Sequence, residues 1–188
     1  GHQFLGNLDS IIETSEKALE LDPNSLPFLM MLSDTLASRP PEDEDEREEQ
    51  MEVAEEYADK ALDMVERLLS GPVTMQMSPE QKSGLTTAVR ATLGRIYFNQ
   101  EEFDDAREEY EKAIEASPRD SASYFFLGLC HARENEGDDA LEALAKAAFL
   151  KGPEEAQARQ TLQNIWETMK KDGDIETFIQ EQGESIRG

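Results

Sequence analysis

A 34-residue period runs through the middle of the chain. At this offset Leu93 coincides with Leu127, Gly94 with Gly128, Ala106 with Ala140, and Ala113 with Ala147. The period equals one helix-turn-helix unit. The small residues mark points where two helix backbones approach closely, and larger apolar side chains fill the space around them. The period therefore predicts stacked helical pairs, each completing its core against the next.

The residue pattern within each period resembles the tetratricopeptide repeat. Residues 87–120 carry the pattern Leu93, Gly94, Tyr97, Ala106, Tyr110, Ala113 and Pro118. Residues 121–154 carry Tyr124, Leu127, Gly128, Ala140, Leu144 and Ala147. Three positions depart from the family pattern: Arg90 replaces a large apolar residue, His131 replaces an aromatic, and Gly152 replaces a proline.

The resemblance implies an all-α fold, an α-solenoid of stacked tetratricopeptide-like repeats wound as a right-handed superhelix. We expect one domain over residues 1–188, with a half repeat at 11–25, a repeat with insertions at 26–86, repeats at 87–120 and 121–154, and divergent capping helices at 155–183. The phase assigns the extra residues of the long repeat to stretches near 38–46 and 69–86. Within them, residues 38–47 and 71–78 contain Pro, Gly and acidic residues and are predicted to be surface connections.

The net charge of −24 narrows the class of partner. A strongly acidic surface repels nucleic acid and anionic membranes at long range, and it favours a basic partner. The acidic run at residues 42–49 has two interpretations, a recognition or cation-binding loop, or a solvated turn that leads into a helix amino terminus. The second interpretation is favoured because the run lacks the ligand spacing and turn glycine of a calcium loop.

The sequence predicts a soluble protein without membrane insertion, because no apolar run approaches the roughly 20 residues of a membrane span. The single Cys130 excludes an intrachain disulfide, so cytoplasmic and exported or periplasmic locations both remain open. The chain starts at Gly1 and enters on the second helix of a unit, which suggests a processing or cloning boundary.

The residues for catalysis are absent from the sequence pattern. The histidines are His2, near the terminus, and His131, which adjoins Cys130 on a predicted helix. Neighbouring positions on a helix point about 100° apart, so Cys130 and His131 are interpreted as packing residues rather than a nucleophile and its base. Zinc ligands are too few, and no glycine-rich phosphate loop is present. We therefore predict no enzyme activity, no metal and no cofactor.

A protein-binding surface remains as the predicted function. In the family that the chain resembles, the first helices of successive units line a concave face that contacts a peptide. The residues at these positions that we predict to bind a partner are Met30, Met31, Asp34, Arg95, Phe98, Asn99, Phe126, Leu129 and Arg133. Apolar side chains grouped with a few arginines suit an adaptable peptide contact in a protein interaction module or scaffold.

Two alternatives stay open. Phe125, Phe126 and Leu129 could instead belong to the core, packed against the 69–86 stretch or a neighbouring helix. The apolar face could also serve self-association into a homo-oligomer, or the chain could be an accessory domain of a larger protein.

Overall fold

The computed structural model describes residues 2–186, and the side chains of residues 2–9 and of Val73 lie outside this description. The expectations for Gly1 and for the side chain of His2 therefore fall outside the described residues. Helices and their connections account for the described chain, which confirms the all-α prediction. The chain divides into two compact units at Glu101 and Glu102, between the two helices of the predicted 87–120 repeat. The predicted repeat boundaries themselves remain a prediction.

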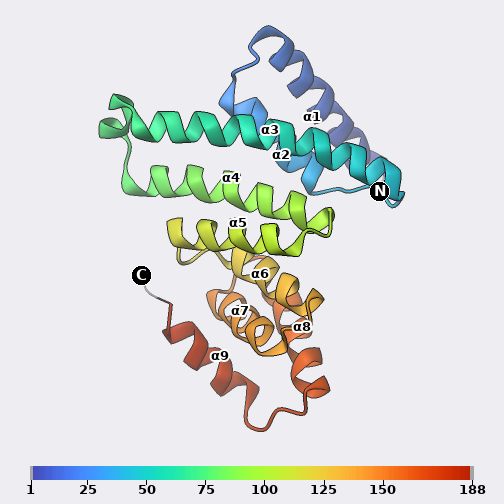
Figure 1. Ribbon diagram of the computed structural model, residues 1–188, viewed down its shortest axis with the longest axis vertical. Helices are drawn as coiled ribbons and strands as arrows, with labels where there is room; N and C mark the ends of the chain where they lie inside the picture. The colour runs from blue at the N-terminus through green and yellow to red at the C-terminus, as the bar shows by residue number, and fades with distance from the viewer. Residues whose placement is uncertain (1, 187–188) are drawn as a thin grey trace. The chain divides into compact units, whose positions relative to one another are not determined.

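The first unit contains helices α1 (His2–Leu21), α2 (Leu26–Ala37), α3 (Glu44–Ser70) and α4 (Pro79–Asn99), with a short 3₁₀ helix η1 (Pro72–Gln76) between α3 and α4 (Figure 1). Helix α2 packs against α1, α3 and α4, and α3 packs against α4. The core of this unit contains Leu29, Leu32 and Leu36 from α2, and Ala54, Ala58, Ala61 and Val65 from α3. Small alanines of α3 and large leucines of α2 thus share one core.

The acidic run forms the beginning of α3. The carboxylate of Asp43 accepts a hydrogen bond from the backbone N–H of Glu46 at 3.1 Å, and Glu44, Asp45 and Glu46 occupy the first turn. Negative charge is favourable at this end of a helix dipole. The structure confirms the interpretation of this run as a helix amino terminus, and it limits the predicted 38–47 connection to residues 38–43.

The predicted insertion at 69–86 is mostly helical rather than a linker. Only residues 71–78 connect α3 to α4, in agreement with the predicted surface connection. At the start of α4, Ser78 and Gln81 form a reciprocal capping box, in which the Ser78 hydroxyl accepts from the Gln81 N–H and the Gln81 carbonyl oxygen accepts from the Ser78 N–H. Pro79 occupies the first turn, where its missing N–H costs nothing. Residues 79–86 therefore extend α4, which corrects the prediction of a long linker.

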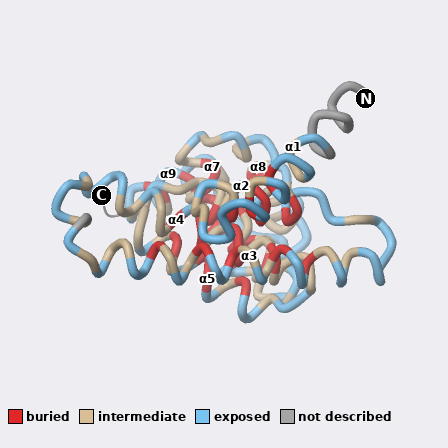
Figure 2. Tube along the Cα trace, turned by 90° about the horizontal axis from the view of Figure 1, so that it is seen from above, coloured by how far each residue is buried: buried red, intermediate tan, exposed pale blue. Residues whose placement is uncertain are grey.

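The second unit contains α5 (Phe103–Ala116), α6 (Ser121–Arg133), α7 (Gly137–Leu150), α8 (Glu155–Thr168) and α9 (Ile175–Glu184). Helix α7 is central, since it packs against α6, α8 and α9. Buried positions recur along the inward side of the helices, and exposed positions recur on the other side (Figure 2). Helices α8 and α9 lie where two capping helices are predicted. Gly173, with φ 105°, precedes Asp174, which caps the start of α9. The rings of Trp166 on α8 and Phe178 on α9 lie 5.2 Å apart.

Gly128 lies at a close approach of α6 and α7. A Cβ atom added to Gly128 would lie 2.7 Å from Cγ of Leu144 and 3.2 Å from the Leu144 backbone nitrogen. The side chain could move, but the backbone nitrogen belongs to the rigid α7. This contact supports the prediction that glycine is required at this repeat position.

We expect Gly128→Ala to lower the free energy of unfolding by about 1 to 2 kcal/mol, because overpacking outweighs the gain in helix propensity. Gly84→Ala in α4 is the matched control, since an added Cβ there meets nothing within 4 Å. That variant should gain up to about 1 kcal/mol. Urea denaturation followed by far-ultraviolet circular dichroism measures both, and stabilisation by Gly128→Ala would contradict the close approach.

Limited proteolysis should distinguish the two connections of the first unit. The 38–43 connection is anchored by Gln50, whose amide donates to the carbonyl oxygens of Leu36 and Arg39 at 2.8 and 2.9 Å. The 71–78 connection instead presents Met75 with 92% of its surface exposed. We expect thermolysin to cut first beside Met75 or Met77, as mass spectrometry of the fragments would show. A first cut inside 89–99 or 121–133 would contradict the helix assignment.

Candidate functional site

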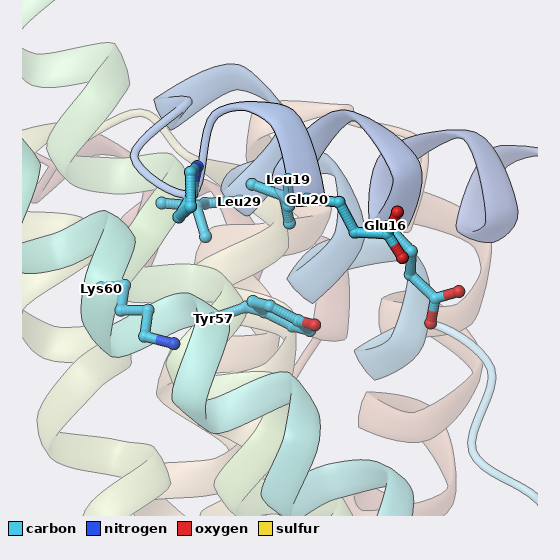
Figure 3. A pocket seen from close by; sticks show the side chains of 7 residues that line it. Glu16, Leu19, Glu20, Leu29, Tyr57 and Lys60 are labelled. Atoms are coloured by element: carbon cyan, nitrogen blue, oxygen red, sulfur yellow. The ribbon is translucent and has the colours of Figure 1, made fainter.

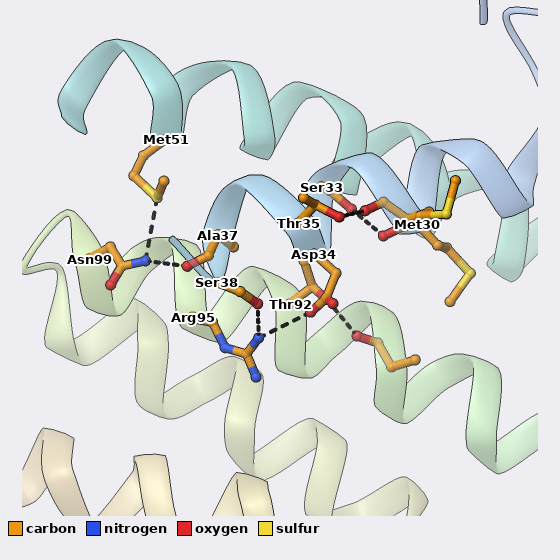
Figure 4. Close-up of polar contacts among 12 residues, drawn as sticks. Met30, Ser33, Asp34, Thr35, Ala37, Ser38, Met51, Thr92, Arg95 and Asn99 are labelled. Carbon is orange, nitrogen blue, oxygen red and sulfur yellow. Dashed lines mark hydrogen bonds and ion pairs between the residues drawn. The ribbon is translucent and has the colours of Figure 1, made fainter. Parts of the chain in front are cut away.

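The predicted binding residues of the first unit lie on α2 and α4 (Figure 4). The Arg95 guanidinium of α4 donates from Nη1 to Oδ1 of Asp34 at 3.0 Å and to the hydroxyl of Ser38 at 2.6 Å. The Arg95 side chain is 25% exposed and the Asp34 side chain is 56% exposed. The structure thus brings these two predicted residues together at a surface, where they join α4 to the end of α2.

Asn99 closes the same junction from the last turn of α4. Its Nδ2 donates to the backbone carbonyl of Ala37 at 2.8 Å and contacts the Met51 sulfur at 3.5 Å. The carbonyl of Ala37 belongs to the last turn of α2, where carbonyl groups lack partners within the helix. Asn99 therefore has a structural role here, whatever else it contacts.

The apolar members of the predicted site in this unit differ in exposure. Met31 is 39% exposed on α2, whereas Met30 is half-buried against the core. Phe98 is half-buried near the end of α4. Met31 is therefore the apolar side chain that lies most open to a ligand beside Asp34.

In the second unit, α6 carries the remaining predicted residues. Phe125 is buried, which places it in the core. Phe126 is half-buried and stacks on Tyr110 of α5 with ring centroids 5.6 Å apart and an interplanar angle of 10°. Leu129 is half-buried against the same core, and Arg133 at the end of α6 is exposed. Phe126 and Leu129 thus contribute to the core and retain some exposed surface, and their role in binding a partner stays a prediction.

A groove opens beside these residues, between the end of α6, the start of α7 and the second half of α8. Its volume is about 310 Å³, and its lining comprises Ala132, Asn135, Gly137, Asn164, Ile165, Thr168 and Met169. We call it the α6–α8 groove. Met169 is 38% exposed, and its sulfur would lie 2.5 Å from a Cβ atom added to Gly137, so a side chain there would require Met169 to move. Ala132 and Gly137 are small residues that leave the space which Ile165 and Met169 border.

The predicted site includes none of the residues that line this groove. Ile165 and Met169 lie one helical turn apart, but such spacing does not tell a core face from the wall of a groove. Ala132, between the predicted site residues Leu129 and Arg133, was the one signal for the groove.

The polar groups around Cys130 form structural contacts. Cys130 is fully buried, and burial raises the pKa of its thiol to about 12, so it is not an accessible nucleophile. The oxygen Oε2 of Glu136 lies 2.7 Å from Nδ1 of His131 and 2.7 Å from Nη1 of Arg107. His131, Glu136 and Asp139 offer ligand atoms within 4.8 Å of one another, but Arg107 already occupies the Glu136 oxygen. The Glu136 carboxylate therefore links Arg107 of α5 to His131 of α6 at the turn between α6 and α7.

No helix within residues 2–186 has the length and apolar character needed to cross a membrane.

Comparisons with known proteins agree with the repeat pattern. A family model described as tetratricopeptide repeat matches residues 92–159, from the middle of α4 into α8. The crystal structure of MamA is similar to this chain with a TM-score of 0.54 and 21% sequence identity, covering 97% of this chain and 88% of that chain. This similarity concerns the fold alone. A search among curated proteins found no significant match.

The Asn99 contact predicts a specific pattern of stability. Asn99→Ala should cost about 1 to 2 kcal/mol because the Ala37 carbonyl loses its donor. Asn99→Asp should cost more, because a carboxylate cannot donate and instead faces the carbonyl oxygen. Asn164→Asp, at an exposed position, is the matched control and should change the free energy of unfolding by less than about 0.5 kcal/mol. Equal effects of the Ala and Asp variants at position 99 in denaturation would contradict the predicted contact.

Proposed function

We propose that this chain, a tetratricopeptide repeat protein, is a non-catalytic interaction module that binds a segment of a partner protein in the α6–α8 groove. The observation that supports the proposal is the groove itself, which has an apolar wall of Ile165 and Met169 and the exposed Arg133 nearby. Its volume of about 310 Å³ lies at the lower end of the range of about 300 to 1,000 Å³ for ligand sites. Such a groove suits one or two side chains of a peptide rather than a large ligand.

The residues around the groove offer the partner two kinds of contact, apolar and charged. Met169 and Ile165 offer adaptable apolar contacts to an aliphatic or aromatic side chain. Arg133 offers a planar guanidinium to a carboxylate or to a backbone carbonyl of the partner. The half-buried Phe126 and Leu129 extend the apolar surface along α6. The Asp34, Arg95 and Met31 surface of the first unit is proposed as a separate contact surface, because Arg95 can exchange Asp34 for a carboxylate of a partner.

The negative charge of the chain favours a partner with a positive net charge. With 42 acidic and 18 basic residues, the protein attracts a partner that is basic overall. Attraction of this kind raises the association rate and weakens with added salt, whereas the apolar contacts in the groove determine the dissociation rate. A scaffold function needs no catalytic group.

The test compares the same substitution at two exposed methionines. Met169→Lys places a charge at the wall of the groove, whereas Met75→Lys places it on the 71–78 connection, far along the chain. In affinity capture from an extract of the source organism, followed by titration of the captured partner, Met169→Lys should weaken binding by about 1 to 3 kcal/mol. This loss corresponds to roughly a 5-fold to 150-fold increase in the dissociation constant. Met75→Lys should leave affinity unchanged, and circular dichroism should show that both variants are folded.

Equal affinities for Met169→Lys and the wild type would exclude the groove as the binding site. Sedimentation equilibrium separates the alternative function. If the wild type self-associates and Met169→Lys is monomeric, the groove holds a second copy of the chain, and self-assembly replaces the interaction module as the function.

A further inference from the structure

A second cleft lies in the first unit, between α1, α2 and α3. Its volume is about 410 Å³, larger than that of the α6–α8 groove. Figure 3 shows the side chains around it: Glu16, Leu19 and Glu20 from α1, Leu29 from α2, and Tyr57 and Lys60 from α3. We call it the α1–α3 cleft. The proposed function does not use it, and none of the residues predicted to bind a partner lines it.

The floor of the α1–α3 cleft is apolar. Leu29 and Leu19 are 1% and 8% exposed and belong to the core of the first unit. The half-buried ring of Tyr57 packs against this core and forms one wall. An apolar side chain that entered the cleft would therefore meet the edge of the core and release water from it.

The rim of the cleft carries an excess of negative charge. Glu16 and Glu20 lie one helical turn apart on α1, so they share one face of the helix. Both are exposed. The neighbouring Lys17 forms its ion pair with Glu13 at 2.5 Å and has only a longer-range attraction to Glu20. Like charges at this spacing repel each other, so a cation placed between them would stabilise the rim.

The one cation of the lining is already neutralised. The ammonium group of Lys60 lies 2.6 Å from Oε1 of Glu56 and 5.7 Å from the centre of the Tyr57 ring. The face of this ring is thus an environment that accepts a positive charge. The cleft as a whole combines an apolar floor, an aromatic wall and two exposed carboxylates whose neighbouring cation, Lys17, is ion-paired with Glu13.

We propose that the α1–α3 cleft binds a cationic amphipathic segment of another protein. An apolar side chain of the segment enters between Leu19, Leu29 and Tyr57. A lysine or arginine of the segment pairs with Glu16 and Glu20. Charge complementarity selects this occupant, because an acidic or neutral segment would leave the two carboxylates unpaired.

The probe for this proposal is a 12-residue synthetic peptide of alternating leucine and arginine, labelled with fluorescein. The control probe has glutamate in place of arginine. Fluorescence anisotropy should show binding of the basic peptide, and methyl chemical shifts in the nuclear magnetic resonance spectrum should change at Leu19 and Leu29. Shifts confined to Ile165 and Met169 would overturn the assignment to this cleft and leave the α6–α8 groove as the binding surface.

A pair of matched double variants separates local pairing from the field of the whole protein. Glu16→Lys with Glu20→Lys reverses the rim of the cleft, and Glu48→Lys with Glu52→Lys reverses an exposed pair with the same spacing on α3 outside the cleft. We expect the first variant to weaken binding of the basic peptide at least 10-fold and the second at most 3-fold. Equal losses in the two variants would overturn the proposal, because the peptide would then respond only to net charge.

Two further measurements complete the test. Tyr57→Ser should also weaken binding of the basic peptide about 10-fold, with its folded state checked by circular dichroism, and unchanged affinity would overturn the role of the aromatic wall.

In sedimentation equilibrium we expect the Glu16 and Glu20 double variant to match the wild type. A wild-type dimer that this variant dissociates would assign the cleft to a second copy of the chain and overturn a partner of another kind. If Met169→Lys does not weaken binding of the partner captured from the extract, this result contradicts only the proposal for the α6–α8 groove and leaves the proposal for the α1–α3 cleft unaffected.

Discussion

The close approach of α6 and α7 at Gly128 determines how the second unit is built. With no side chain at Gly128, Leu144 can lie against the α6 backbone, so α7 comes near enough to bury alanines 140, 143 and 147 on its inward face. Helix α7 also packs against α8 and α9. A larger residue at position 128 would separate α6 from α7 and change the width of the α6–α8 groove, whose lining comes from three helices. The size of the residue at position 128 therefore affects both the packing of the core and the width of the groove at the surface.

The few basic residues of the chain form ion pairs mainly at turns and helix ends. Basic residues are in the minority, and several of them hold turns and helix ends together: Arg107 bridges Asp104, Glu134 and Glu136, and Arg159 joins Glu155 to Glu176. Exposed pairs of this kind contribute little free energy each, but they fix the geometry of connections. The consequence is that few cations remain to balance the many carboxylates elsewhere. Sites with a local excess of carboxylates, such as Glu16 and Glu20, are then the places where a cation from a partner would be stabilised most.

The sequence predicted the features that depend on local spacing. Gly128, Leu144 and the alanines of α3 and α7 were identifiable because a fixed period repeats their sizes. The extension of α4 over residues 79–86 was missed, although Ser78 and Gln81 have the spacing of a capping box and Pro79 suits a first turn. The partners of Arg95 and Asn99 could not be predicted, because Asp34 and Ala37 lie 61 and 62 residues away along the chain. The α1–α3 cleft was also beyond sequence reasoning, since it exists only where three helices of two predicted repeats meet.

The placement of Trp166 and Cys130 has a practical consequence for experiments. They are the single tryptophan and the single cysteine of the chain, and both lie in the second unit, Trp166 beside Phe178 and Cys130 in full burial. Intrinsic tryptophan emission and thiol labelling therefore follow the opening of residues from Glu102 onward and are silent on the helices before it. Far-ultraviolet circular dichroism follows both units together. The natural sequence thus supplies an internal reporter for one half of the molecule, and the difference between the two signals measures how cooperatively the halves unfold.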